Sequence, residues 1–243
     1  GIIEAGVRKD TPRGTPQGGV CSPILANLYL HHVVDLWFNR IVRKHIRGNA
    51  YMVRYADDII FCFQYDDDVK RFYKALKKRL AKFELEISEE KTKIIKLPKD
   101  SDDEDDGGTF DFLGFTHYMG RCKDGVRRLK RKTSKKRYKR GLKRCKMWLK
   151  ENRTMPIKEL MRKLNRKLVG TYNYYAVSDN KKSMSSFHHE ICRLVFKWLN
   201  RRSQKKSFSW KKFKIFLRKY NIVRPMIKVN LYKLGAGASY LSE

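Results

Sequence analysis

Two adjacent aspartates, Asp57 and Asp58, are the residues of this chain best suited to chemistry. They lie at a short step between two apolar, β-prone runs, residues 51–54 and 59–63, and this pattern predicts a β-hairpin. Neighbouring carboxylates repel each other, and a divalent cation offsets that cost. Hard oxygen ligands suit Mg²⁺, and two such ions about 4 Å apart assist phosphoryl transfer. An ordinary Asp-rich β-turn is the alternative interpretation.

Three further blocks could serve the same chemistry. Upstream, Gly18 and Gly19 allow a close backbone approach to a ligand, and Gln17 offers both a donor and an acceptor. The same glycines would also suit a turn that caps the next helix. Downstream, residues 88–93 offer a lysine that could reach a triphosphate, and an apolar turn at residues 112–115 could press on a primer strand.

The elements that must position these residues are predicted from apolar periodicity. Pro23 suits the first turn of a helix, with Ser22 as its N-cap. Strands and helices in this mixture predict an α+β fold in which helices cover one face of an antiparallel sheet. The expected elements are helices over 23–45 and 66–83, short strands over 85–87 and 93–97, and part of a hairpin over 110–118.

The chain changes character near residue 127, because thirteen of the twenty residues 127–146 are Lys or Arg. Just before that point, the acidic residues 99–108 lack the ligand spacing of a calcium loop and predict a solvated insertion. Helices are predicted over 134–152, 156–175, 183–202 and 209–220. The expected core of this half is Leu160, Leu164, Leu168, Tyr172, Ile191, Leu194, Val195, Trp198 and Leu199.

The charge is strongly unbalanced: 57 Lys and Arg stand against 25 Asp and Glu, a formal net charge of +32. A polyanionic partner would relieve that self-repulsion. A solvated surface and an anionic membrane surface are the alternative interpretations of this charge. The sequence contains no apolar run of 18 residues, so no transmembrane helix is expected. Five widely spaced cysteines support neither a disulfide framework nor a zinc site, so we expect reduced thiols in an intracellular protein.

Residues 14–30, 54–58, 90–93 and 112–115 follow one another in an order that resembles the reverse transcriptases. The likeness is closest to the group II intron-encoded reverse transcriptase/maturases. In that family the second block is the catalytic hairpin and the fourth is the primer grip. Residues 164–175 resemble the signature of the maturase, or thumb, domain, and the likeness continues through 196–202 and 224–232.

The resemblance implies a role for each block. It makes Asp57, Asp58 and Lys91 catalytic, with the two aspartates binding Mg²⁺, or Mn²⁺ in its place, and with Lys93 as an alternative to Lys91. The implied nucleotide-binding residues are Pro16, Gln17, Gly18, Tyr55 and Ala56, and the implied primer grip is Phe112, Leu113, Gly114 and Phe115. The implied RNA-binding residues are Arg127, Arg128, Lys130, Arg131, Lys132, Lys135, Lys136, Arg137, Lys139 and Arg140.

The resemblance also implies domains and partners. It predicts a partial polymerase palm over 1–126, an all-helical thumb/maturase domain over 127–234, and a flexible tail over 235–243. The expected partners are group II intron RNA, an RNA template with a DNA primer, and a dNTP. No membrane partner is expected, and a homodimer is left open. The expected location is the cytoplasm of a bacterial-type cell.

Two departures from the family pattern shape the expectation. The finger blocks and the first catalytic aspartate belong before residue 1, which predicts a fragment with an incomplete metal site. No Cys/His endonuclease block follows, so DNA cleavage is not expected. Two alternatives remain open: a non-catalytic RNA-binding splicing factor, and a relative from another lineage such as the retron or defence-associated enzymes. Residues 170–175 argue against the second.

Overall fold

The computed structural model describes residues 2–4, 7–9, 19–98, 107–122, 125–202 and 208–231, the first two stretches by their backbone alone. The chain folds as two compact units, Gly1–Ile94 and Ile95–Glu243. Each unit has its own hydrophobic cluster. Residues 99–106 of the predicted acidic insertion, the predicted tail at 235–243 and residues 10–18 lie outside the described residues.

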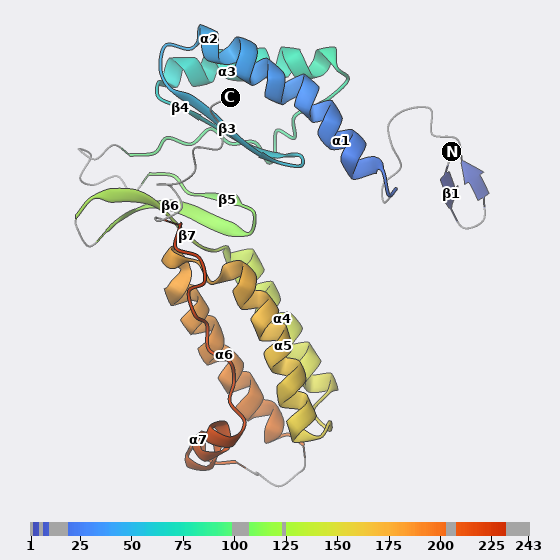
Figure 1. Cartoon of the computed structure of the whole chain (residues 1–243), viewed down its shortest axis with the longest axis vertical. Coiled ribbons are helices and arrows are strands. Elements are labelled where there is room, and N and C mark those ends of the chain that lie inside the picture. Colours follow the sequence, from blue (N-terminus) through green and yellow to red (C-terminus); the bar gives the residue numbers. More distant parts are fainter. Residues whose placement is uncertain are drawn as a thin grey trace. The chain divides into compact units, whose positions relative to one another are not determined.

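The first unit packs helices against one side of a two-stranded hairpin, as Figure 1 shows. Phe38, Val42, Ala50, Phe72 and Leu76 form its buried cluster. Its elements are α1 (Ser22–Leu30), η1 (His31–Asp35), η2 (Phe38–Val42), α2 (Arg43–His45), β3 (Ala50–Tyr55), β4 (Asp58–Phe63) and α3 (Asp66–Lys82). Two short strands, β1 (Ile2–Glu4) and β2 (Val7–Lys9), pair with each other in antiparallel fashion.

The first helical run begins as predicted but is not a regular α-helix throughout. Pro23 lies in its first turn, while Cys21 rather than Ser22 occupies the N-cap position, so the prediction for Ser22 is wrong. Between α1 and α2 the run contains two π-helical segments, η1 and η2. π-Helical turns often occur at functional sites, and η1 contributes Asp35 to the site described below.

Only part of the apolar face expected over 23–45 is buried. Phe38 and Val42 are buried in the core, but Ile24, Leu28 and Ile41 are about half exposed or more. The described residues therefore cover the second half of this helical run more fully than the first. Helix α3 matches its prediction over 66–83, because Phe72 and Leu76 lie on one buried face.

The second unit joins a three-stranded antiparallel sheet to a bundle of helices (Figure 1). Strand β6 lies between β5 and β7. Helices α4, α5 and α6 run side by side, and α7 lies at the end of the bundle away from the sheet (Figure 1). The elements are β5 (Phe110–Phe112), β6 (Phe115–Arg121), β7 (Arg127–Thr133), α4 (Lys135–Glu151), α5 (Ile157–Tyr175), η3 (Ser178–Asn180), α6 (Lys181–Leu199) and α7 (Trp210–Lys219).

The bundle core agrees with its prediction. Leu164, Ile191 and Val195 have no exposed surface, and Leu194 is the only predicted core residue that is partly buried rather than buried. After α7 the chain returns along the bundle, where the backbone of Val229 pairs with Val177 at the end of α5 (Figure 1). The return segment therefore ties the far end of the bundle to the sheet end.

Two predictions about strands are wrong. Residues 85–87 and 93–97 form no strand, and the stretch from Leu85 to Pro98 is irregular apart from a turn at Glu89–Lys91. The half expected to be all helical begins instead with a strand, because β7 pairs with β6 from Arg127 through Thr133. None of the described helices combines the length and the apolar character needed to cross a membrane.

Candidate active site

The predicted hairpin around the two aspartates is confirmed. Strands β3 and β4 pair from Ala50 with Phe63 to Tyr55 with Asp58, which leaves Ala56 and Asp57 as a two-residue turn. The φ angle of Ala56 is 54°, a left-handed conformation that favours glycine and is uncommon for alanine. Two-residue hairpin turns require such positive φ angles because they match the twist of the strands.

The two carboxylates are available for a ligand. Asp57 and Asp58 are both exposed, and neither side chain forms an ion pair with any described residue. Adjacent exposed carboxylates present the oxygen donors that Mg²⁺ prefers. In the described part of the chain, no cluster of three or more His, Cys, Asp or Glu residues could hold a metal ion. A divalent ion at the two carboxylates would therefore take the rest of its shell from water and substrate phosphate.

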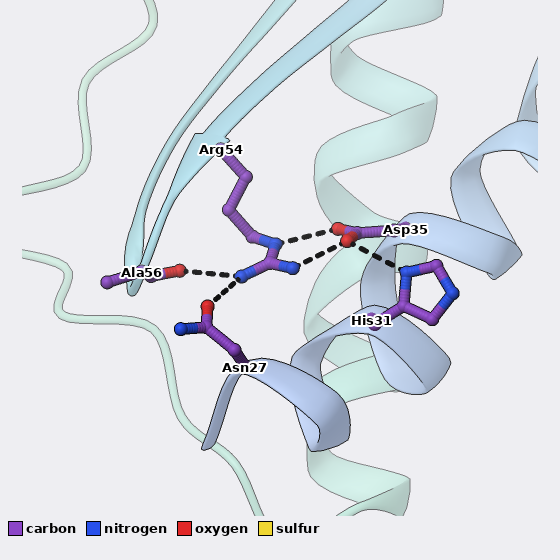
Figure 2. Close-up of polar contacts among 5 residues, drawn as sticks. All are labelled: Asn27, His31, Asp35, Arg54 and Ala56. Atoms are coloured by element: carbon purple, nitrogen blue, oxygen red, sulfur yellow. Dashed lines mark hydrogen bonds and ion pairs between the residues drawn. The ribbon is translucent and has the colours of Figure 1, made fainter. Parts of the chain in front are cut away.

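Arg54 connects the base of this turn to the helices, as Figure 2 shows. Its Nε and Nη2 donate to the two carboxylate oxygens of Asp35 at 2.8 and 2.6 Å. Its Nη1 donates to Asn27 Oδ1 at 2.8 Å and to the carbonyl oxygen of Ala56 at 3.1 Å. One guanidinium group therefore joins α1, η1 and the turn that carries Asp57.

The carboxylate of Asp35 is held in its charged form. Burial alone would raise its pKa, but the hydrogen bonds and charge of Arg54 outweigh that effect, and His31 adds to them, so the pKa of Asp35 is lowered. Nδ1 of His31 lies 3.3 Å from Asp35 Oδ2. The Arg54 and Asp35 side chains are only 13% and 16% exposed, which makes this pair less screened by water than a surface ion pair.

The sequence motifs include Arg54 and Asn27 but indicate no role for either, and they do not include Asp35. One feature of the sequence could have indicated that Arg54 has a buried partner. Inward positions of β3 alternate as Ala50, Met52 and Arg54, and a charged residue at an inward position needs a partner. Nothing in the spacing indicates which acidic residue of the preceding helix supplies it.

The other predicted residues of the nucleotide site are only partly described. Pro16, Gln17 and Gly18 lie outside the described residues. Lys91 is exposed in a turn in which its backbone N–H donates to the carbonyl oxygen of Ser88 at 3.1 Å. No hydrogen bond or ion pair joins the Lys91 side chain to the hairpin in the described part of the chain. The structure therefore places Tyr55, Ala56, Asp57 and Asp58 together at the end of one hairpin.

The predicted primer-grip residues form a second tight turn, within the second unit. Phe112 pairs with Phe115, and both turn residues have positive φ, 48° for Leu113 and 80° for Gly114. This combination is the type I′ geometry favoured in hairpins. A side chain at Gly114 would meet the hydroxyl of Tyr175, which lies 2.8 Å from the position of its Cβ.

Tyrosines at the end of α5 hold this turn in place. The hydroxyl of Tyr174 donates to the carbonyl oxygen of Leu113 at 2.7 Å, and its ring stacks on Phe115 with centroids 5.8 Å apart. Tyr172 is buried at 3% exposure, as its helical spacing predicted. The tyrosine-rich end of α5 and the apolar turn are therefore one packed assembly.

Asn180 supports the junction beneath that turn. Its side chain accepts from the backbone N–H of Thr133 at 2.8 Å and donates to the hydroxyl of Thr133 at 2.7 Å. It also donates to the carbonyl oxygen of Tyr175 at 2.9 Å. Because Asn180 is fully buried, these bonds fix the point at which β7 passes into α4.

The predicted RNA-binding residues occupy β7 and the first turns of α4. Most are exposed: Arg128, Lys132, Lys135, Lys136, Arg137, Lys139 and Arg140. Arg127, Lys130 and Arg131 are partly buried, and Arg131 forms an ion pair with Asp179 at 3.4 Å. Helix α4 begins with a side-chain cap from Ser134 and has no acidic residue in its first turn, so its exposed surface there is uniformly basic.

Two family models match the chain in succession. The model described as reverse transcriptase (RNA-dependent DNA polymerase) matches residues 4–117 and so includes the aspartate hairpin and the turn at Leu113. The model described as group II intron, maturase-specific domain matches residues 138–216, from α4 to α7. No curated protein matches the chain. Because the two matches together span more than half of its residues in the order that the motifs indicated, the chain belongs to the group II intron reverse transcriptase/maturases, whose function joins RNA-directed DNA polymerisation to the splicing of intron RNA.

Proposed function

We propose that this chain supplies the catalytic turn of an RNA-directed DNA polymerase at β3–β4, with Asp57 and Asp58 as ligands of Mg²⁺. The observation that carries the proposal is the turn itself. It presents two adjacent exposed carboxylates, and Arg54 ties its backbone to two helical segments. A costly local conformation that the surrounding structure over-determines is typical of functional sites.

In this proposal each residue near the turn has a distinct task. The bound divalent ion would activate a primer 3′-hydroxyl and neutralise charge on the leaving pyrophosphate. Asp57 is the principal ligand, and Asp58 supports the site beside it. Tyr55 and Ala56 border the nucleotide, together with Pro16, Gln17 and Gly18. Lys91 is the proposed proton donor to the pyrophosphate, supported by its exposed position, and Lys93 is the alternative.

The second unit would position nucleic acid. The turn at Leu113 and Gly114 is the proposed primer grip, supported by its two positive φ angles and by the hydrogen bond from Tyr174. The basic surface of β7 and α4 is the proposed contact to the phosphates of template and intron RNA. Lysine and arginine bind phosphate without reading sequence, so this surface would supply affinity rather than specificity.

The metal assignment can be tested with Mn²⁺, which substitutes for Mg²⁺ and is detected directly by electron paramagnetic resonance. We expect Asp57→Asn to weaken Mn²⁺ binding to the chain by about tenfold or more, because one of two charged ligands is lost. Asp66→Asn is the matched control, since Asp66 is an exposed aspartate that pairs with Lys70 on α3. Equal Mn²⁺ affinity in wild type and Asp57→Asn would contradict the proposed metal site at the turn.

A second candidate function is RNA binding in splicing without catalysis. The match to the maturase-specific domain and the basic surface of α4 favour it. Both candidates predict tight, salt-sensitive RNA binding, so binding alone does not separate them. Templated nucleotide incorporation by residues 1–243 would contradict this second candidate, because RNA binding without catalysis predicts none.

A further inference from the structure

The guanidinium group of Arg54 makes more contacts than a structural ion pair needs. Arg54 lies on β3 two residues before Ala56, and its side chain faces the helices rather than solvent (Figure 2). Two of its nitrogens bind the two oxygens of Asp35. The third nitrogen is shared between the Asn27 side chain and the backbone of Ala56. All three nitrogens of the guanidinium group are therefore engaged.

The contact with Ala56 acts where the turn is least favourable. A left-handed conformation is unfavourable for a residue with a Cβ, and Ala56 adopts one with φ of 54°. The hydrogen bond from Arg54 to the Ala56 carbonyl oxygen fixes the peptide that leads into Asp57. The orientation of this peptide sets the direction in which the Asp57 side chain leaves the backbone.

The partners of Arg54 are themselves held. Asp35 belongs to η1 and approaches His31 one helical turn earlier. The neighbouring carbonyl of Val33, within the same π-helical segment, accepts from Nε of Arg79 on α3 at 3.1 Å. Contacts from α3 thus brace the segment that presents Asp35, and Asp35 in turn orients the arginine.

We propose that Arg54, anchored by Asp35 and Asn27, is a positioning residue that fixes the Ala56–Asp57 peptide so that the carboxylates of Asp57 and Asp58 are presented together. The inference deepens the proposed function and rests on it for the purpose of that presentation. A lysine cannot replace this arginine, because an ammonium group lacks the planar arrangement of donors that binds a carboxylate and two further acceptors at once.

The test compares Arg54→Lys with Arg47→Lys in the full chain. Arg47 is the matched control, because it also pairs with aspartates of the first unit, Asp67 at 3.2 Å and Asp68 at 4.0 Å, on the side of α3 rather than at the turn. Hydrogen exchange of the amides of residues 56–59 is the first readout. We expect exchange there to rise about tenfold in Arg54→Lys, as for the loss of one charge-assisted hydrogen bond, and to stay unchanged in Arg47→Lys.

Two further measurements distinguish positioning from general stability. Mn²⁺ affinity of Arg54→Lys should fall severalfold while the exchange rates of α3 amides stay as in wild type. In templated incorporation, the same variant should lower kcat with little change in the KM for the nucleotide. Asp35→Asn should reproduce these effects, and the double variant should add little, because both residues act through the same turn.

Several results would overturn the inference. Unchanged exchange at residues 56–59 in a folded Arg54→Lys variant would mean that the arginine does not fix the turn. A uniform rise in exchange across β3, β4 and α3 would assign it to the stability of the unit instead. If Asp57→Asn binds Mn²⁺ as tightly as wild type, the proposed metal site fails, whereas the exchange comparison still decides whether Arg54 fixes the turn.

Discussion

The backbone of Ala56 has a positive φ angle of 54°, which suits glycine better than alanine. Ala56→Gly should therefore leave the free energy of unfolding unchanged or raise it slightly. Ala75→Gly is the matched control on the exposed side of α3, where the same change should cost about 1 kcal/mol. Urea denaturation measures both. A similar loss in the two variants would mean that the turn does not hold alanine in a left-handed conformation.

Asp35 gives the site a defined pH dependence. Its lowered folded-state pKa means that its contribution to stability is present above the unfolded-state pKa of about 3.9 and is lost as pH falls through the folded-state value. The melting temperature of Asp35→Asn should therefore lie below that of wild type at about pH 6, and the gap should close below about pH 4. A gap that stays constant from about pH 6 to about pH 3 would contradict the ion pair with Arg54.

At the scale of elements, the link between α5 and the apolar turn is the contact most open to test. Tyr174→Phe removes the hydrogen bond to Leu113 but keeps the ring on Phe115. We expect a loss of about 1 kcal/mol in the free energy of unfolding and faster exchange of the amides at residues 113–115. Tyr220→Phe is the control, because its hydroxyl bonds to no described residue. Equal effects in the two variants would mean that the hydroxyl of Tyr174 does not stabilise the turn at Leu113.

Helix α5 was predictable from the sequence because it buries a continuous apolar face. Leu160, Leu164 and Leu168 recur at helical spacing, and all three are buried. The hairpin around Asp57 was predictable for a related reason, since two apolar strands flank a short polar turn. Local patterns of this kind carry enough information to define an element.

The remaining features depend on contacts that no local pattern records. Strand β7 is basic along its length and is defined by its pairing with β6, so its side chains give no apolar alternation to detect. Residues 85–87 alternate and residues 93–97 contain two β-branched isoleucines, but neither stretch finds a partner strand among the described residues. The contact of Arg54 with Asp35 joins residues 19 positions apart, and the π-helical segment that permits it has no sequence signature.

At the scale of the whole molecule, the net charge of +32 predicts RNA binding that weakens steeply with salt. The triple variant Lys135→Ala, Lys136→Ala, Lys139→Ala should reduce the slope of log K against log salt concentration by about 2 to 3, as three phosphate contacts are lost. The control carries Lys74→Ala, Lys78→Ala and Lys82→Ala on the exposed face of α3. Filter binding at several salt concentrations measures both. Equal slopes in the two triple variants would mean that α4 is not the contact surface.

The most direct measurement of the central claim is templated primer extension, on an RNA template with Mg²⁺ and dNTPs, by a protein that joins this chain to the finger and palm blocks expected before residue 1. Asp57→Asn is compared with wild type, and Asp66→Asn is the control. The account predicts that wild type and Asp66→Asn extend the primer and that Asp57→Asn loses at least about a hundredfold in rate, about 2.7 kcal/mol of barrier, while still binding RNA. Extension by Asp57→Asn at the rate of wild type would contradict the assignment of this turn as the polymerase site.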